Sequence, residues 1–188
     1  MRIILASSSP RRKKLLDLLG IKYEVIPPRV QEDHVGIGDF GILVENIALR
    51  KATEVYERTF EERIVIGADT IVVYKGEVLG KPSSKEEAKE YLNKLSGDEH
   101  YVYTGVAFVW NEGRVTFHER TRVWFRDIPP EVVELYVKSG SPMDKAGAYG
   151  IQDLGAAFVR KIEGDFYTVM GLPIGRVWEF LWEKGFWK

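Results

Sequence analysis

The fold is decided near the N-terminus by the stretch IILASSSPRRKKLL, residues 3–16. Its first four residues are apolar and predict a buried strand. Three serines and Pro10 follow, which is typical of a helix start, because proline suits the first helical turn and Ser9 can accept a hydrogen bond from a free N–H group. The stretch therefore predicts a strand that runs directly into a helix, and Gly20 is expected to end that helix.

The rest of the chain alternates between strand-like and helix-like patterns. Apolar runs between turn residues predict strands at 23–26, 64–66, 71–74, 101–110, 114–125, 158–162 and 166–169. Helical spacing with capping residues predicts helices at 44–55, 84–95, 130–137 and 173–181. Gly67 and Ala68 are expected to interrupt the strand pattern, and residues 140–155 to form a glycine-rich binding loop. This mixture predicts an α/β (α+β) fold in one domain, with a sheet bent around a central cleft.

The composition argues against several classes of protein. Apolar residues make up 45% and charged residues 29% of the chain, which is the balance of a water-soluble globular protein. Lys and Arg number 27 against 28 Asp and Glu, so no global positive field exists to hold a nucleic-acid backbone. The lack of cysteine excludes disulfides, thiol nucleophiles and cysteine-bound zinc. Because no apolar run approaches the roughly 20 residues of a membrane span and no secretory signal pattern is seen, a cytoplasmic protein is expected.

Four cations, Arg11 to Lys14, occupy the predicted first turn of the helix that begins at Pro10. The partial positive charge of a helix N-terminus disfavours cations at that place. A bound polyanion would reverse the balance, because free N–H groups, the hydroxyls of residues 7–9 and two guanidinium groups would converge on phosphate. The alternative is that the four cations form a solvated face of an exposed helix.

Asp69 stands among apolar residues, directly after the expected break at Gly67 and Ala68. A carboxylate buried in that setting pairs with a cation, binds a metal or serves as a general base. The alternative is a turn in which Asp69 accepts a hydrogen bond from its own downstream backbone, a frequent use of aspartate. The pattern leaves both interpretations open.

Weaker indications of a binding site come from Lys81 and from the acidic residues Glu32 and Asp33. Glycine and proline on either side of Lys81 fix the backbone beneath a long cation, although an exposed turn lysine is the ordinary alternative. Glu32 and Asp33 can supply oxygen ligands for Mg²⁺, which needs only one or two carboxylates besides substrate phosphates. The three histidines lack the HExxH spacing, and no P-loop, nucleophile elbow or dinucleotide fingerprint occurs. Zinc hydrolases, P-loop enzymes, α/β-hydrolases and dinucleotide oxidoreductases are therefore not expected.

Taken together, these segments resemble the Maf proteins, nucleotide pyrophosphatases of the same superfamily as the inosine-triphosphate pyrophosphatases. The resemblance runs from end to end of the chain, in the family's order, through LASSSPRRKKLL (5–16), GADTIV (67–72), GKP (80–82), SG (96–97) with TGV (104–106), DKAGAYGIQ (144–152) and GLP (171–173). It implies an elongated mixed β-sheet, strongly bent and flanked by helices, with two lobes around a central cleft.

The resemblance also implies an activity and a set of residue roles. The activity is hydrolysis of dTTP and UTP to the monophosphate and pyrophosphate, with a divalent cation, Mg²⁺, Mn²⁺ or Co²⁺, as cofactor. Asp69 would be the general base, and Glu32 would help it to hold the metal. The substrate-binding set would be Ser7, Arg11, Arg12, Lys51 and Lys81, and the residues that select the base would be Arg11, Thr70 and Gln152.

Other functions stay open on the sequence. One is a housecleaning pyrophosphatase for modified nucleotides, for a purine nucleotide or for CTP. Another is a nucleotide-binding regulator of cell division, since the family name has been associated with septum formation. The expected partner is a nucleoside triphosphate, not a nucleic acid or a membrane. A homodimer is also expected, although the aromatic residues of the C-terminus can equally serve core packing.

Overall fold

The computed structural model describes residues 2–32, 38–59 and 62–187. Within them, seven strands form one sheet in the order β2-β1-β3-β5-β6-β7, with β4 paired to β3. β1 runs parallel to β2 and to β3, whereas the pairs β3–β4 and β6–β7 are antiparallel. The strands are β1 (Arg2–Ala6), β2 (Glu24–Val25), β3 (Arg63–Tyr74), β4 (Glu77–Leu79), β5 (Glu99–Trp110), β6 (Gly113–Phe125) and β7 (Val159–Glu163).

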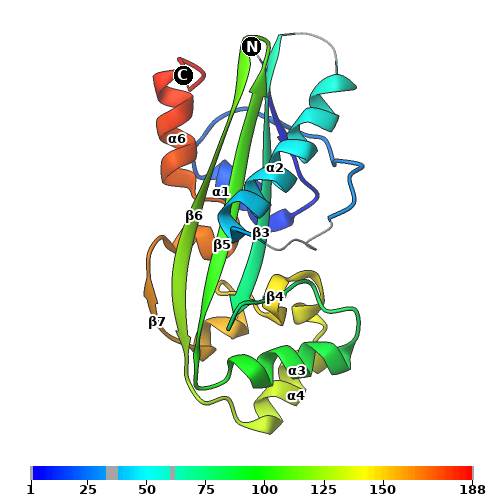
Figure 1. Cartoon of the computed structure of the whole chain (residues 1–188), viewed down its shortest axis with the longest axis vertical. Coiled ribbons are helices and arrows are strands. Elements are labelled where there is room, and N and C mark those ends of the chain that lie inside the picture. The colour runs from blue at the N-terminus through cyan, green and yellow to red at the C-terminus, as the bar shows by residue number, and fades with distance from the viewer. Residues whose placement is uncertain (1, 33–37, 60–61, 188) are drawn as a thin grey trace. The chain divides into compact units, whose positions relative to one another are not determined.

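Helices flank this mixed sheet, which confirms the expected α/β class (Figure 1). They are α1 (Pro10–Asp17), α2 (Phe40–Glu57), α3 (Lys85–Leu95), α4 (Pro130–Lys138), α5 (Phe166–Met170) and α6 (Ile174–Glu183). Short 3-10 helices at Ser141–Asp144, Ala146–Ala148 and Leu154–Phe158 occupy the glycine-rich segment. Among the described residues, no helix combines the length and the apolar character that crossing a membrane requires.

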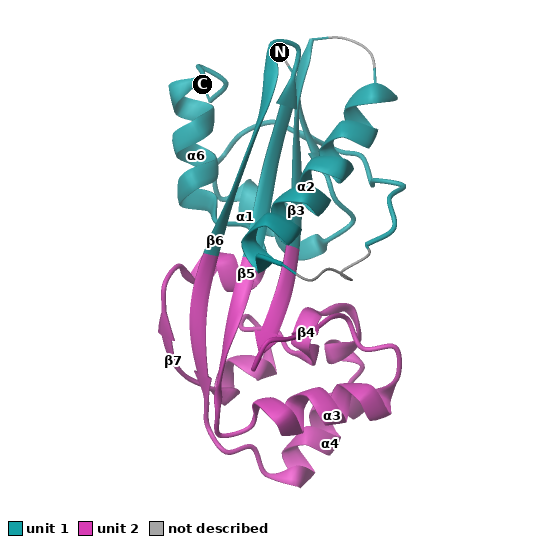
Figure 2. Ribbon diagram, viewed as in Figure 1, with its two compact units in different colours: residues 1–69, 104–119, 171–188 teal, residues 70–103, 120–170 magenta. Residues whose placement is uncertain are grey.

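The chain divides into two compact units (Figure 2). Each unit has its own hydrophobic core. Unit 1 comprises residues 1–69, 104–119 and 171–188, and unit 2 comprises residues 70–103 and 120–170. In unit 1, small and branched residues of β1, β3 and β5 pack against α2. In unit 2, the apolar faces of α3 and α4 join Val102, Val123 and Phe125 of the sheet in a second core.

The alternation of side chains along the strands decides which residues meet α2. Ile4 in β1 and Val65 in β3 share a core cluster with the small residues of α2. Gly67 has the same parity as Val65, and a Cβ atom at Gly67 would lie 2.3 Å from the carbonyl oxygen of Ala48. The glycine therefore lets helix and strand approach closely. Asp69 is the next residue of that parity, so its side chain is directed to the α2 face of the sheet.

Two expectations about strands were wrong. Gly67 and Ala68 do not break the strand, because β3 continues from Arg63 to Tyr74 and Gly67 serves close packing instead. Residues 166–169 form helix α5 and not a strand. The Asp165 carboxylate accepts hydrogen bonds from both the backbone N–H and the hydroxyl of Thr168, and so satisfies donors at the helix start.

The aromatic C-terminus is used only partly for packing. Phe180 of α6 stacks on Phe108 of β5, with ring centroids 4.0 Å apart. Trp178 and Trp182, on the same helix, are 40% and 57% exposed. Core packing therefore accounts for Phe180 but not for these two indoles.

Candidate active site

Asp69 lies inside β3, and its side chain is buried in unit 1 with 3% of its surface exposed. Because the residue is in extended backbone within a strand, the turn interpretation is wrong. A carboxylate at this depth costs several kcal/mol unless a cation accompanies it. The interpretation that requires a charged partner is the one that the structure supports.

The partner of Asp69 is Lys51, which comes from the middle of α2 and is 2% exposed. Its ammonium donates to Asp69 Oδ1 at 2.6 Å, to Glu32 Oε1 at 2.8 Å and to the Ala68 carbonyl oxygen at 3.4 Å. An ammonium has three donors, so these contacts use all of them. Two carboxylates thus converge on one buried cation, and the Glu32 side chain, 32% exposed, lies at the more open end.

Ser7 and Arg12 form the second part of the site, where β1 gives way to α1. The Ser9 hydroxyl caps α1 by accepting from the backbone N–H of Arg12 at 3.5 Å, as the sequence predicted. The buried Ser7 hydroxyl accepts from the backbone N–H of Ser9 at 3.1 Å and from Arg12 Nη1 at 3.4 Å. Arg12 Nε donates to the Gly171 carbonyl oxygen at 2.8 Å. The guanidinium is therefore held in a fixed direction from two sides.

The charges of the two parts of the site, the Lys51 cluster and Arg12, act on one another. Burial lowers the pKa of Arg12 below the ordinary value of an arginine, while the negative charges of Asp69 and Glu32 act to raise it. The positive charge of Arg11, half-buried in the first turn of α1, lowers it further. Unit 1 therefore brings Ser7, Arg11, Arg12, Glu32, Lys51 and Asp69 into one electrostatic environment.

The remaining predicted site residues lie in unit 2. Thr70 follows Asp69 in β3 and is half-buried. Lys81 is exposed between β4 and α3. Gln152 is exposed in the glycine-rich segment, whose Gly147 N–H donates to the Gly80 carbonyl oxygen at 3.1 Å. Asp33 and His34 lie outside the described residues.

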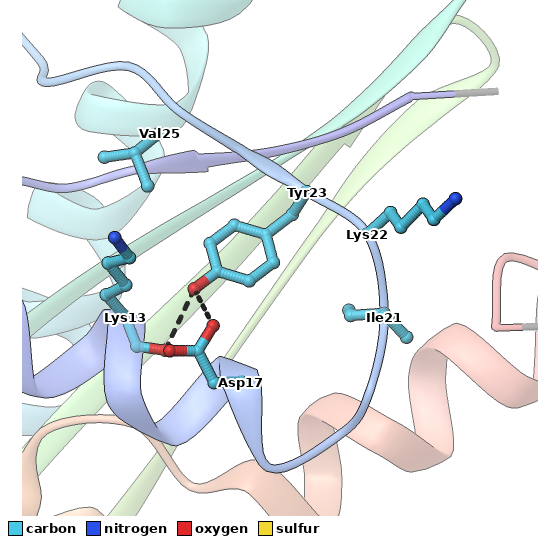
Figure 3. Close-up of a pocket in the computed structure, with 6 residues that line it drawn as sticks. All are labelled: Lys13, Asp17, Ile21, Lys22, Tyr23 and Val25. Atoms are coloured by element: carbon cyan, nitrogen blue, oxygen red, sulfur yellow. Dashed lines mark hydrogen bonds between the residues drawn. The ribbon is translucent and has the colours of Figure 1, made fainter.

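A surface pocket of about 510 Å³ in unit 1 contains none of the predicted site residues (Figure 3). In it the Tyr23 hydroxyl lies 2.6 Å from Asp17 Oδ1 and 3.0 Å from the Lys13 carbonyl oxygen, which ties the segment before β2 to α1. The other lining residues are Ile21, Lys22 and Val25. These contacts stabilise the α1–β2 connection, and the pocket holds no buried charged pair comparable to Lys51 and Asp69.

Nearly the whole chain matches a protein family. A sequence profile described as Maf-like protein covers residues 2–184. The chain belongs to the Maf-like family. A dTTP/UTP pyrophosphatase of Thermotoga petrophila is 55% identical, over 100% of this chain and 92% of the relative. A dTTP/UTP pyrophosphatase of Bacillus anthracis is 51% identical, over 94% of this chain and 92% of the relative. A solved HAM1 protein from Coxiella burnetii is 18% identical, with a TM-score of 0.45 over 69% of this chain and 75% of that one.

One contact of this Maf-like site was missed by sequence reasoning. The carbonyl oxygen of Gly171 fixes Arg12, although the GLP motif had been given no role. Gly171 has φ of +109°, a conformation that favours glycine. A glycine before leucine and proline does signal a special backbone, but nothing in the sequence tells which side chain will bind its carbonyl oxygen.

Proposed function

We propose that this Maf-like protein hydrolyses dTTP and UTP to the nucleoside monophosphate and pyrophosphate. Relatives at 50–55% identity carry the name dTTP/UTP pyrophosphatase, and the match extends over nearly the whole of both chains. The observation that carries the chemistry is the buried Lys51–Asp69 pair beside Arg12 and Ser7. A carboxylate, a lysine and an arginine at one place are suited to water attack on the phosphoanhydride of a highly charged triphosphate.

The cations would bind the triphosphate. Arg12 is oriented by Ser7 and Gly171, and Arg11 lies next to it at the start of α1. The partial positive charge at the N-terminal end of α1 favours an anion at the same place. As charge develops on the departing pyrophosphate, these fixed positive groups would stabilise it, and losing one such contact typically raises the barrier by about 2.7 to 4 kcal/mol.

Asp69 would accept the proton of the attacking water. In the free protein its Oδ1 is bound by Lys51, which weakens it as a base. A phosphate oxygen that accepts a hydrogen bond from Lys51 would have to replace one of the three present acceptors, because the ammonium has no further donor. Where the acceptor that the phosphate replaces is Asp69 Oδ1, the carboxylate is left able to take a proton. Attack on the α-phosphorus from oxygen-18 water would place the label in the monophosphate.

A divalent cation fits the acidic groups of this site. Glu32 and Asp69 each place a carboxylate oxygen within 2.8 Å of the Lys51 nitrogen, so the two carboxylates lie close together around the position of the ammonium. Mg²⁺ is ordinarily held by one or two carboxylates together with substrate phosphates, and no described group of three or more His, Cys, Asp or Glu side chains gathers to bind a metal without such help. Glu32 and Asp69 would hold the ion, which when bound neutralises phosphate charge.

Base selection is assigned by family resemblance to Arg11, Thr70 and Gln152, and Lys81 is assigned to the phosphates. A glutamine amide both donates and accepts, which matches the O4 and N3–H edge that uracil and thymine share. A base with a different edge would leave the amide unpaired, so discrimination can be large.

The test is a panel of nucleoside triphosphates assayed for pyrophosphate release with Mg²⁺. The proposal expects dTTP and UTP to be hydrolysed fastest. Preference for CTP, a purine nucleotide or a modified nucleotide would favour the housecleaning alternative, and tight nucleotide binding without turnover would favour the regulatory one. Omitting the metal, with EDTA present, is the control for the cofactor.

We also propose a cytoplasmic homodimer, in which the exposed indoles of Trp178 and Trp182 on α6 form the contact between subunits. The two indoles stack on one another with ring centroids 6.3 Å apart, and Trp182 lies 5.7 Å from the ring of Trp187, so they form one apolar patch of the kind that marks protein contacts. Sedimentation at several concentrations tests the dimer, and Trp182→Glu is expected to give a monomer.

A further inference from the structure

Gln152 lies at the tip of a tight turn in unit 2. The backbone N–H of Asp153 donates to the Gly150 carbonyl oxygen at 3.4 Å, which makes Ile151 and Gln152 the central residues of the turn. Ile151 is 7% exposed and belongs to the core of unit 2, whereas Gln152 is exposed. Because the buried Ile151 anchors the turn, the backbone on either side of Gln152 determines where its amide can reach.

One phenol holds both ends of this turn. Tyr136 of α4 is 1% exposed, and its hydroxyl donates to Asp153 Oδ1 at 2.8 Å and accepts from the Gly150 N–H at 3.0 Å. Burial raises the pKa of Tyr136 well above the ordinary value of a tyrosine, so the hydroxyl stays protonated and able to donate. The same oxygen therefore bridges the residues on the two sides of Gln152.

Further contacts lock the Asp153 carboxylate in place. Its Oδ1 accepts from the Gly155 N–H at 2.8 Å, and its Oδ2 accepts from the Ser141 hydroxyl at 2.8 Å. The ammonium of Lys145, with 10% of its side chain exposed, lies 3.4 Å from Oδ2. A Cβ atom at Gly150 would come within 2.7 Å of that same oxygen, so the backbone of the turn packs closely against the carboxylate.

We propose that Tyr136 is a positioning residue for base selection, which holds Gln152 in the orientation that reads the base through its hydrogen bonds to Gly150 and Asp153. The inference rests on the proposed function, in which Gln152 contacts the base. Hydrogen bonds are directional, so an amide on a loose turn would pair with several bases by rotating. A turn with both ends fixed removes that freedom and makes the amide selective.

The experiment compares Tyr136→Phe with Tyr91→Phe. The control removes the same kind of group, because the Tyr91 hydroxyl donates to Glu87 Oε1 at 2.8 Å on α3 of the same unit. For Tyr136→Phe we expect KM for dTTP and UTP to rise about five- to tenfold, with little change in kcat. This factor is what one hydrogen bond, that between Gln152 and the base, is worth. The preference for dTTP over dCTP should fall by the same factor. Tyr91→Phe should leave both quantities at their wild-type values.

A second comparison tests that the effect passes through Gln152. In a Gln152→Ala background, Tyr136→Phe should change base preference no further, and a full additional loss would overturn the inference. Should Tyr136→Phe fail to fold, Ser141→Ala removes one hydrogen bond to Asp153 and is expected to shift KM in the same direction by a smaller factor. Wild-type selectivity in a folded Tyr136→Phe variant would overturn the inference alone. A wild-type protein without activity on any nucleoside triphosphate would contradict the proposed function instead.

Discussion

Replacing Lys51 with methionine tests how much the buried Lys51–Asp69 ion pair contributes to the stability of the fold. Methionine has nearly the length and the helix propensity of lysine, so the change mainly removes the charge and the donors. The side chains of Lys51 and Asp69 are 2% and 3% exposed, and their contact measures 2.6 Å. Removing one partner of such a buried pair typically costs about 3 to 5 kcal/mol, because the other charge is left uncompensated. For a chain of this size, Tm should fall by about 6 to 20 °C.

The assay is thermal unfolding followed by circular dichroism at pH 7. Lys94→Met is the matched control, since Lys94 also lies in a helix and contacts two carboxylates, but its side chain is 30% exposed and those of Glu77 and Glu90 are more than half exposed. Exposed pairs contribute about 1 kcal/mol or less, so its Tm should change little. In the double variant Lys51→Met with Asp69→Asn, the decrease in Tm should be smaller than the sum of the decreases in the two single variants. Equal Tm values for Lys51→Met and Lys94→Met would refute the reasoning.

Three further changes test other parts of the structure. Burial lowers the pKa of His100 from 6.5 to about 3, so the folded protein keeps this imidazole neutral. In the unfolded chain the same side chain takes up a proton below about pH 6.5. The free energy of unfolding should therefore be at its full value above that pH and fall by up to about 5 kcal/mol towards pH 3. Urea unfolding across this range should show a flatter pH dependence for His100→Gln, and equal slopes would rule out this residue as the cause. Gly67→Ala places a methyl group against the backbone of α2 and should lower the free energy of unfolding by about 2 to 3 kcal/mol in the same denaturation assay. Gly175→Ala in α6 is the control: it has open space around it and should be neutral or slightly stabilising. Lys22→Ala, in the pocket of Figure 3, should leave kcat and KM for dTTP unchanged, and a large loss of activity there would show that the pocket takes part in catalysis.

Local signals in the sequence were sufficient to predict most of the helices and strands. Ser9 and Ser84 cap α1 and α3 as predicted, because a cap depends only on residues within one helical turn. Gly67 was misinterpreted, since a glycine in an apolar run looks like a break until the neighbouring helix is known. Residues 166–169 were assigned to a strand because they follow the Gly164–Asp165 turn, but Asp165 caps a helix there instead.

The candidate site was predictable as a set of residue types, but the pairing within it was not. A carboxylate buried among apolar residues needs a cation, a metal or a catalytic role, but the sequence left open the alternative of a turn in which Asp69 bonds its own backbone. Lys51 was named through the family resemblance, although its spacing from Ile47 and Val55 places it on the apolar face of α2, a signal that sequence reasoning did not use. The Tyr136–Asp153 network was missed because its members are 17 residues apart and meet only in the folded chain.

The most direct test of the proposed chemistry is pyrophosphate release from dTTP by the wild type and by Asp69→Asn, with Mg²⁺ present and dTTP binding measured on both. Loss of the proton acceptor should lower kcat about a hundredfold or more, while the binding constant for dTTP changes only a few-fold. A variant that releases pyrophosphate at the wild-type rate would contradict the role of Asp69 on which the mechanism depends.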